Sequence, residues 1–143
     1  MGGYHVVFPQ KTVMSHHSSL TIGSLLLRPK CLGIVQHEGV LVGCNVVLHN
    51  TPEKGEHISS VEGFAAGHPI QVLATGVHPS VIVARARRIL LRPKAYDLLA
   101  RNCQHTSSEI VRGVAKSSWA IGAAIVLAAI VVIWVVSVLS RRA

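Results

Sequence analysis

Residues 119–139 are apolar or small throughout and contain no charged side chain. As a helix, about twenty such residues rise about 30 Å, which matches the hydrocarbon core of a bilayer. Basic residues flank the run on both sides, and a tryptophan stands at its start. The alternative, a core helix of a soluble domain, would show a polar face, and this run shows none. We therefore predict one transmembrane helix, with residues 117–143 as a C-terminal membrane anchor.

The rest of the chain is long enough for one small domain. Residues 20–116 are sufficient for a modest single core, and we expect residues 1–19, which show little periodicity, to be loosely held. The chain carries 14 Lys+Arg against 6 Asp+Glu. Because the domain holds the larger basic excess, we expect it on the cytoplasmic side of the membrane. An odd number of cysteines, 3, favours free thiols and a reducing compartment.

Two histidines lie in a predicted β-hairpin. Residues 32–42 and 45–49 are short apolar segments joined by a tight turn, and each contains one of the pair, His37 and His49. Side chains alternate between the two faces of a strand, so a hairpin can bring both imidazoles to one edge of a sheet. Such a pair can supply a general base and a group that orients it.

A cysteine follows a favourable helix cap later in the chain. Asn102 is a good N-cap residue, and apolar residues recur at helical spacing after it. We therefore expect Cys103 at a helix N-terminus, where the dipole and a nearby imidazolium would stabilise its thiolate. With a histidine as base, this pattern predicts a cysteine nucleophile.

Together these segments resemble the lecithin-retinol acyltransferase family. Its members carry a block of the form His-x-Gly-Ile-Tyr-x-Gly, a second histidine at the end of the next strand, and later Asn-Cys-Glu-His-Phe. Here residues 37–43 read HEGVLVG, the second histidine is His49, and residues 102–106 read NCQHT. Residues 22–26 (IGSLL) look like the strand that opens the family domain. The resemblance covers roughly residues 20–115.

The resemblance implies an α+β domain of the circularly permuted papain-like type found in NlpC peptidases, with a small antiparallel sheet packed on helices. It implies that Cys103 is the nucleophile, His37 the general base and His49 the residue that orients it. Family members take an acyl chain from a lipid as a thioester and pass it to water, an amine or an alcohol. The family's aromatic residues are replaced here by Glu38 and Leu41 in the first block and by Thr106 in the later one, which bears on the substrate range.

Zinc binding is the sharpest alternative for the same side chains, because two imidazoles and a thiolate can leave one coordination position open. Beside the resemblance it is the weaker hypothesis, so we expect neither a metal nor a cofactor. The other histidines, His57 among them, lie in loop or terminal contexts and are discounted. His105 belongs to the resembled block but is expected to point away from the thiol and to be structural. Cys31 and Cys44 are expected to be bystanders.

A predicted helix over residues 79–91 carries the main basic feature. Arg85, Arg88 and Arg92 recur at helical spacing beside an apolar stripe. The plain interpretation is a solvated face, and the functional one is contact with anionic lipid headgroups. Nucleic-acid binding is not expected, since aromatic residues make up only 4% of the chain and offer no stacking platform.

The other predicted elements are short. A strand is expected over residues 20–27, ended by a following proline, and another over residues 69–74. Residues 50–56 predict a polar loop, and residues 61–66 a short helix that a serine can cap.

Three classes of function remain open from the sequence. The first is a membrane-anchored thiol acyltransferase or phospholipase that acts on phospholipid acyl chains. The second is a papain-like cysteine peptidase or amidase, in which the same three side chains cleave an amide. The third is a non-catalytic anchored module that remodels membranes or recruits a partner. The anchor favours the first class because it confines the nucleophile to a lipid surface.

Overall fold

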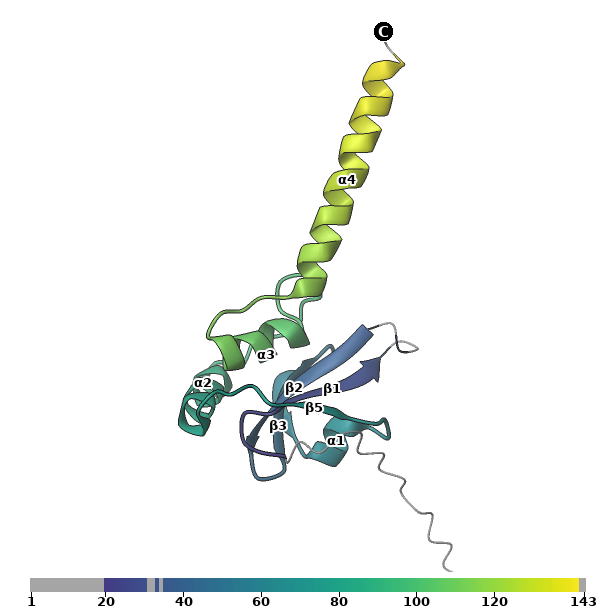
Figure 1. The fold of residues 1–143 in the computed structure, drawn as a ribbon. Coiled ribbons are helices and arrows are strands. Elements are labelled where there is room, and N and C mark those ends of the chain that lie inside the picture. The colour runs from purple at the N-terminus through teal and green to yellow at the C-terminus, as the bar shows by residue number, and fades with distance from the viewer. Residues whose placement is uncertain (1–19, 31–32, 34, 142–143) are drawn as a thin grey trace, which may run out of the picture.

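The computed structural model describes residues 20–30, 33 and 35–141. Within them, five strands form one antiparallel sheet in the order β4-β3-β2-β1-β5, and four helices accompany it (Figure 1). The strands are β1 (Leu25–Lys30), β2 (Val35–Gly43), β3 (Val46–Thr51), β4 (Gly55–Ser59) and β5 (Gln71–Leu73); the helices are α1 (Val61–Ala65), α2 (Pro79–Leu91), α3 (Cys103–Arg112) and α4 (Ser118–Ser140). The prediction of an α+β fold with a small antiparallel sheet is confirmed. The predicted N-terminal segment, residues 1–19, lies outside the described residues.

The predicted hairpin is present as β2 and β3. Its turn contains Asn45, which adopts a left-handed backbone with φ 54°, as tight hairpin turns require. Gly39 lies opposite His49 in the register. A Cβ at Gly39 would lie 2.6 Å from Val47 Cγ1 and 2.7 Å from Phe64 Cε2. Glycine at this position therefore allows Phe64 to pack directly on the hairpin.

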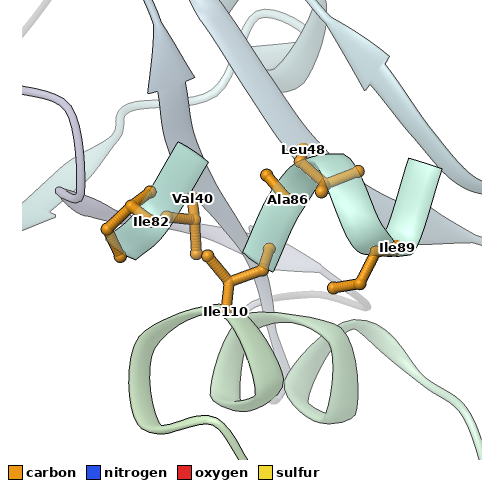
Figure 2. Packing of buried hydrophobic residues seen from close by; sticks show 6 residues of the cluster. All are labelled: Val40, Leu48, Ile82, Ala86, Ile89 and Ile110. Atoms are coloured by element: carbon orange, nitrogen blue, oxygen red, sulfur yellow. The ribbon is translucent and has the colours of Figure 1, made fainter. Parts of the chain in front are cut away.

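Different helices cover the two faces of the sheet. On one face, Leu26, Leu41 and Val47 pack around the fully buried Phe64 of α1. On the other face, α2 and α3 pack their apolar stripes against β2 and β3 (Figure 2). This second cluster consists of Val40, Leu48, Ile82, Ala86, Ile89 and Ile110. Each large aliphatic side chain buried in this way contributes roughly 1.5–3 kcal/mol, so the cluster fixes both helices on the hairpin.

β1 differs from its prediction over residues 20–27. Gly23, with φ 96°, turns the chain before β1 begins, and the strand then passes through Pro29, which lies opposite Gln36. In the described residues, β5 pairs with β1 only as far as Leu27. Pro29 therefore lies where β1 has become an edge strand, the position at which a sheet tolerates proline.

β4 replaces part of the predicted polar loop. The loop predicted over residues 50–56 is shorter in the structure and covers only residues 52–54, because β3 continues to Thr51 and β4 begins at Gly55. β4 pairs antiparallel with β3 and brings His57 opposite His49. Its sequence has no apolar run because it is an edge strand, held by backbone pairing to β3 more than by burial.

The other elements follow their predictions. α1 begins after Ser60, whose side chain accepts a hydrogen bond from the Gly63 backbone N–H. α2 has the predicted bounds, and β5 lies within residues 69–74. α3 begins at Cys103, with Asn102 as its N-cap.

α4 extends away from the domain as a long apolar helix (Figure 1). It has 23 residues, its most apolar window has a mean hydropathy of 2.9, and none of that window is buried. By length and composition it could cross a membrane. The coarse prediction of one long, exposed apolar helix at this end of the sequence is confirmed.

Candidate active site

The hairpin brings the two candidate histidines into direct contact. His37 on β2 and His49 on β3 both face α1, and their side chains are almost fully buried. His37 Nε2 lies 3.0 Å from His49 Nδ1. Phe64 stacks on the His37 ring at a centroid distance of 5.4 Å and contacts the His49 ring edge-on. The orientation of both rings is therefore fixed by packing as well as by hydrogen bonding.

A serine continues this chain of hydrogen bonds and assigns its direction. Ser59 Oγ donates to the Ser60 carbonyl at 3.1 Å, so it accepts the hydrogen of His49 Nε2 at 2.9 Å. His49 Nδ1 is then the acceptor, and His37 Nε2–H is the donor. By this assignment, the Nδ1 atom of His37 keeps the free lone pair that a general base needs.

Burial keeps both imidazoles neutral. It is the largest cause that lowers the pKa of His37 to about 3, and the neighbouring His49, Arg28 and Lys30 lower this pKa further. Burial likewise lowers the pKa of His49 to about 4, followed by the effect of His57. At neutral pH, therefore, the pair has one proton on each ring, as the hydrogen-bond assignment requires.

The lowered pKa values predict a fold that weakens in acid. The unfolded chain binds protons at both histidines near pH 6.5, whereas the folded chain does so only near pH 4 and pH 3. Stability from this source is complete above about pH 6.5 and is lost as pH falls toward these lower values. We expect the free energy of unfolding to decrease by roughly 2–5 kcal/mol between pH 7 and pH 4.5.

Thermal unfolding of the full chain in detergent, followed by near-ultraviolet circular dichroism, measures this decrease. His49→Gln removes one of the two buried groups and should flatten the pH dependence. His68→Gln is the matched control, because His68 is exposed and its replacement should leave the dependence unchanged. Equal pH dependence in the two variants would contradict the assignment.

Cys103 lies at the start of α3, in the gap where β2 and β3 separate. Among the described residues, the pairing of β2 with β3 ends at Gly39 and His49. Glu38 precedes Gly39 in β2, and its backbone N–H is close enough to the Cys103 thiol to favour the thiolate and so lower the pKa of Cys103. Asn50 Nδ2 of β3 donates to the Arg101 carbonyl at 2.9 Å, which holds the segment before α3 in the same gap.

The thiol is more buried than the sequence prediction assumes. Burial raises the pKa of Cys103, and this effect outweighs the opposing backbone N–H groups of Glu38 and Gln104. The expected stabilised thiolate is therefore not the resting state, and the proton remains on sulfur at neutral pH. In the described residues, no hydrogen bond joins the thiol to His37 or His49. The structure pairs the histidines and places the thiol beside the backbone of the strand that carries His37.

Three residues near the site were not predicted from the sequence. Ser59 and His57 lie on β4, the missed strand, and the His57 ring centroid lies 4.2 Å from that of His49. Glu38 accepts a hydrogen bond from Ser107 Oγ and so joins β2 to α3. The sequence signal for Ser59 and His57 was the turn sequence of residues 52–55, which would have predicted a second hairpin.

His105 forms part of the helix cap. The Asn102 backbone N–H donates to His105 Nδ1 at 3.2 Å, and Asn102 Oδ1 accepts from the backbone N–H groups of Gln104 and His105. This reciprocal capping box fits the structural role expected for His105. In the described part of the chain, no group of three His, Cys, Asp or Glu side chains could hold a metal ion, so the zinc alternative has no ligand set there.

The first turn of α4 is attached to the first turn of α3. Gln104 Oε1 accepts hydrogen bonds from Ser117 Oγ at 2.8 Å and from the Trp119 backbone N–H at 3.1 Å. Asn102 Nδ2 also donates to Ser117 Oγ, at 3.0 Å. The start of the apolar helix therefore contacts both sequence neighbours of Cys103. These hydrogen bonds fix α4 to the helix that carries the thiol.

A buried ion pair supports this end of α3. Arg101 contacts the fully buried Glu56 of β4, and its Nη1 donates to Glu109 Oε2 of α3 at 2.6 Å. Glu56 also accepts from Thr106 Oγ1 at 2.9 Å. Removal of one partner from such a pair leaves an uncompensated buried charge, which is strongly destabilising. The network therefore holds α3 at a fixed position against β4.

The basic face of α2 is smaller than predicted. Arg85 Nη1 donates to the carbonyl groups of Ile110 and Val111, at 3.0 and 2.8 Å, and so binds the C-terminal end of α3. The prediction that Arg85 faces outward with the other two arginines is wrong for this reason. Arg88 and Arg92 are exposed.

Comparison of the chain with protein-family models and with curated proteins found no match. The function of the protein is therefore inferred from its residues and their arrangement.

Proposed function

We propose that the protein is a membrane-anchored thiol acyltransferase and phospholipase, similar to the lecithin-retinol acyltransferase family and of the permuted papain-like type. In this proposal Cys103 is the nucleophile, His37 the general base and His49 its orienting group. α4 crosses the bilayer, and the domain lies on the cytoplasmic side. No metal or cofactor takes part.

One observation carries the proposal: the helix that begins with Cys103 is joined at its first turn to α4 and lies beside the strand of the histidine pair. Gln104 and Asn102 make the hydrogen bonds to the start of α4. The backbone N–H of Glu38, the residue after His37, lies beside the Cys103 thiol. A nucleophile placed here would meet ester groups at the surface of the bilayer that α4 crosses. A peptidase has no need of this connection, so the geometry favours a lipid substrate.

In the first half of the reaction, Cys103 Sγ attacks the carbonyl carbon of a phospholipid ester and its proton passes to His37 Nδ1. The carbonyl electrons move to oxygen, and the backbone N–H of Cys103, which has no acceptor among the described residues, is available to donate to that oxygen. The intermediate then expels the lysophospholipid oxygen, which takes the proton from the His37 imidazolium. The products are a lysophospholipid and an acyl thioester on Cys103.

In the second half, water, an amine or an alcohol attacks the thioester carbonyl and gives a proton to His37. The carbon–sulfur bond breaks, and the departing thiolate of Cys103 takes that proton back. The acyl chain leaves as a fatty acid, an amide or an ester. His49 accepts the His37 Nε2–H bond throughout and so holds the base in one tautomer.

The resting pKa values set a requirement on substrate binding. A buried thiol of raised pKa and an imidazole of lowered pKa do not exchange a proton at rest. Once formed, a thiolate and an imidazolium stabilise each other, because each charge offsets the burial cost of the other. His37 faces α1, whereas α3 packs on the other face of the sheet. The proposal therefore requires substrate binding to let Cys103 Sγ and His37 Nδ1 meet through the gap between β2 and β3; catalytic hydrogen bonds often form only in the substrate complex.

The test is the direct detection of the acyl-enzyme. Full-length protein in phospholipid vesicles is incubated with a phospholipid that carries an isotope-labelled acyl chain, quenched in acid, and analysed by peptide mass spectrometry. We expect the peptide that contains Cys103 to gain the mass of one labelled acyl chain, with the label removed by hydroxylamine, as a thioester requires.

Cys44→Ser is the matched control, because Cys44 is exposed on the hairpin turn and its loss should leave the labelling unchanged. An acyl group on Cys44 but none on Cys103 would contradict the proposed nucleophile. If no cysteine is labelled under any lipid condition, a non-catalytic anchored module explains the chain better.

A further inference from the structure

Two consecutive leucines are exposed on the loop between α2 and α3. Leu98 is 52% exposed and Leu99 is 56% exposed. Exposed single leucines are common, but a pair at the tip of a loop presents a contiguous apolar surface that water solvates poorly. These two side chains require an explanation that the catalytic site does not provide.

The loop that carries them is well ordered by hydrogen bonds. The backbone N–H of Asp97 donates to the Arg101 carbonyl and that of Arg101 donates to the Asp97 carbonyl, both at 2.9 Å. Between them, Asp97 Oδ1 accepts from the backbone N–H groups of Leu99 at 2.9 Å and Ala100 at 2.7 Å. The bonds close a tight turn, so the leucines are held outward at little further entropic cost.

The same loop is fixed next to the start of α4. Asn102 Nδ2 donates to the Leu98 carbonyl at 2.9 Å and also to Ser117 Oγ, the N-cap of α4, at 3.0 Å. In Figure 1 the segment before α3 reaches the base of α4. A single amide group therefore sets the position of the leucines relative to the first turn of the apolar helix.

We propose that Leu98 and Leu99 insert into the interface of the bilayer that α4 crosses and form a second membrane contact beside it. The inference rests on the proposed function in one respect, namely that α4 spans the membrane. The continuity of the loop with the base of α4 favours lipid over a protein partner as the occupant. Lys116, which precedes α4, would lie at the level of the anionic headgroups, as interfacial basic residues do.

A second pair of leucines provides a matched control within the same chain. Leu90 and Leu91 are 38% and 73% exposed and line a shallow cavity of about 360 Å³ on α2 with Val83. However, α2 and α4 are attached to opposite ends of α3. Arg85 of α2 binds the C-terminal end of α3, whereas α4 is bonded to the first turn of α3. The proposal therefore places this second pair away from the bilayer.

The experiment measures the membrane depth of single labelled positions in the full chain. All three cysteines are replaced by serine, one cysteine is introduced as Leu99→Cys, Leu91→Cys or Ile130→Cys, and an environment-sensitive fluorophore is attached. Each protein is reconstituted in vesicles of phosphatidylcholine and phosphatidylserine that contain spin-labelled lipid. We expect quenching at position 99 to exceed that at position 91 by roughly threefold or more, since interfacial groups lie within reach of the upper acyl chains.

Position 130, in the middle of α4, separates the inference from the proposal on which it rests. Quenching at 130 with no more quenching at 99 than at 91 would overturn the second contact while leaving the anchor intact. Absence of quenching at both 99 and 130 would overturn the anchor as well. A label at 99 that is shielded from water but not quenched by lipid would indicate a protein partner and also contradict the inference.

A functional measurement provides a second readout. The double substitution Leu98→Ser/Leu99→Ser should lower acyl transfer from vesicle phospholipid several-fold and leave the hydrolysis of a water-soluble activated ester unchanged. Leu90→Ser/Leu91→Ser should change neither rate. Equal loss on both substrates in the first variant would indicate a structural role for the loop instead of a membrane contact.

Discussion

Replacement of Cys103 by alanine is expected to lower acyl transfer by roughly 10⁴-fold or more, because a reaction that proceeds through a covalent intermediate has no substitute for its nucleophile. The fold should persist, since α3 is held by the Asn102 cap and by the buried pair of Arg101 with Glu56. The measurement is the release of labelled fatty acid from vesicle phospholipid, together with the circular dichroism of the variant.

Cys44→Ala is the matched control and should retain nearly full turnover, because Cys44 is exposed and distant in the register from the histidine pair. Turnover in Cys103→Ala within tenfold of the original would refute the thiol mechanism. Loss of turnover in Cys44→Ala would mean that the wrong sulfur has been assigned.

The second large effect separates the roles of the two histidines. His37→Ala removes the proton acceptor and should lower turnover by about 10²–10⁴-fold, the usual contribution of a positioned general base. His49→Gln should cost much less, because a glutamine oxygen can accept the His37 Nε2–H bond that His49 Nδ1 accepts at 3.0 Å. The rate is also measured as a function of pH. Only His37→Ala, which removes the general base, should abolish the fall in rate at low pH.

Equal losses in His37→Ala and His49→Gln would show that the two imidazoles act as one unit and that the assignment of separate roles is wrong. Ser59→Ala adds a check on the direction of the hydrogen bonds. It removes the acceptor of His49 Nε2–H at 2.9 Å and should produce a smaller loss than either histidine substitution.

The features that could be predicted from the sequence are those set by local spacing. The hairpin follows from two apolar segments and a turn residue, Asn45, that tolerates a positive φ, and the start of α3 follows from the capping preference of Asn102. The contact between His37 and His49 depends only on this hairpin and on the alternation of side chains in strands.

Features set by distant contacts could not be predicted in the same way. β4 has a turn signal in residues 52–55 but no apolar run of its own, because it is an edge strand held by its pairing with β3, so Ser59 and its bond to His49 were missed with it. Arg85 has the spacing of an exposed residue, but it binds the carbonyl end of another helix 25 residues away. The burial of Cys103 depends on how α3 packs in the gap between two strands, which no local pattern reports.

The bonds between α3 and α4 also have a mechanical consequence. At 23 residues, α4 is about 34 Å long, slightly more than the roughly 30 Å of an average hydrocarbon core, and a helix of excess length tilts. Because Gln104 holds the first turn of α4, a change of tilt would rotate the whole domain with it. Lipid thickness would then set the angle at which the thiol approaches the membrane surface, so one chain could work at different rates in thin and thick membranes.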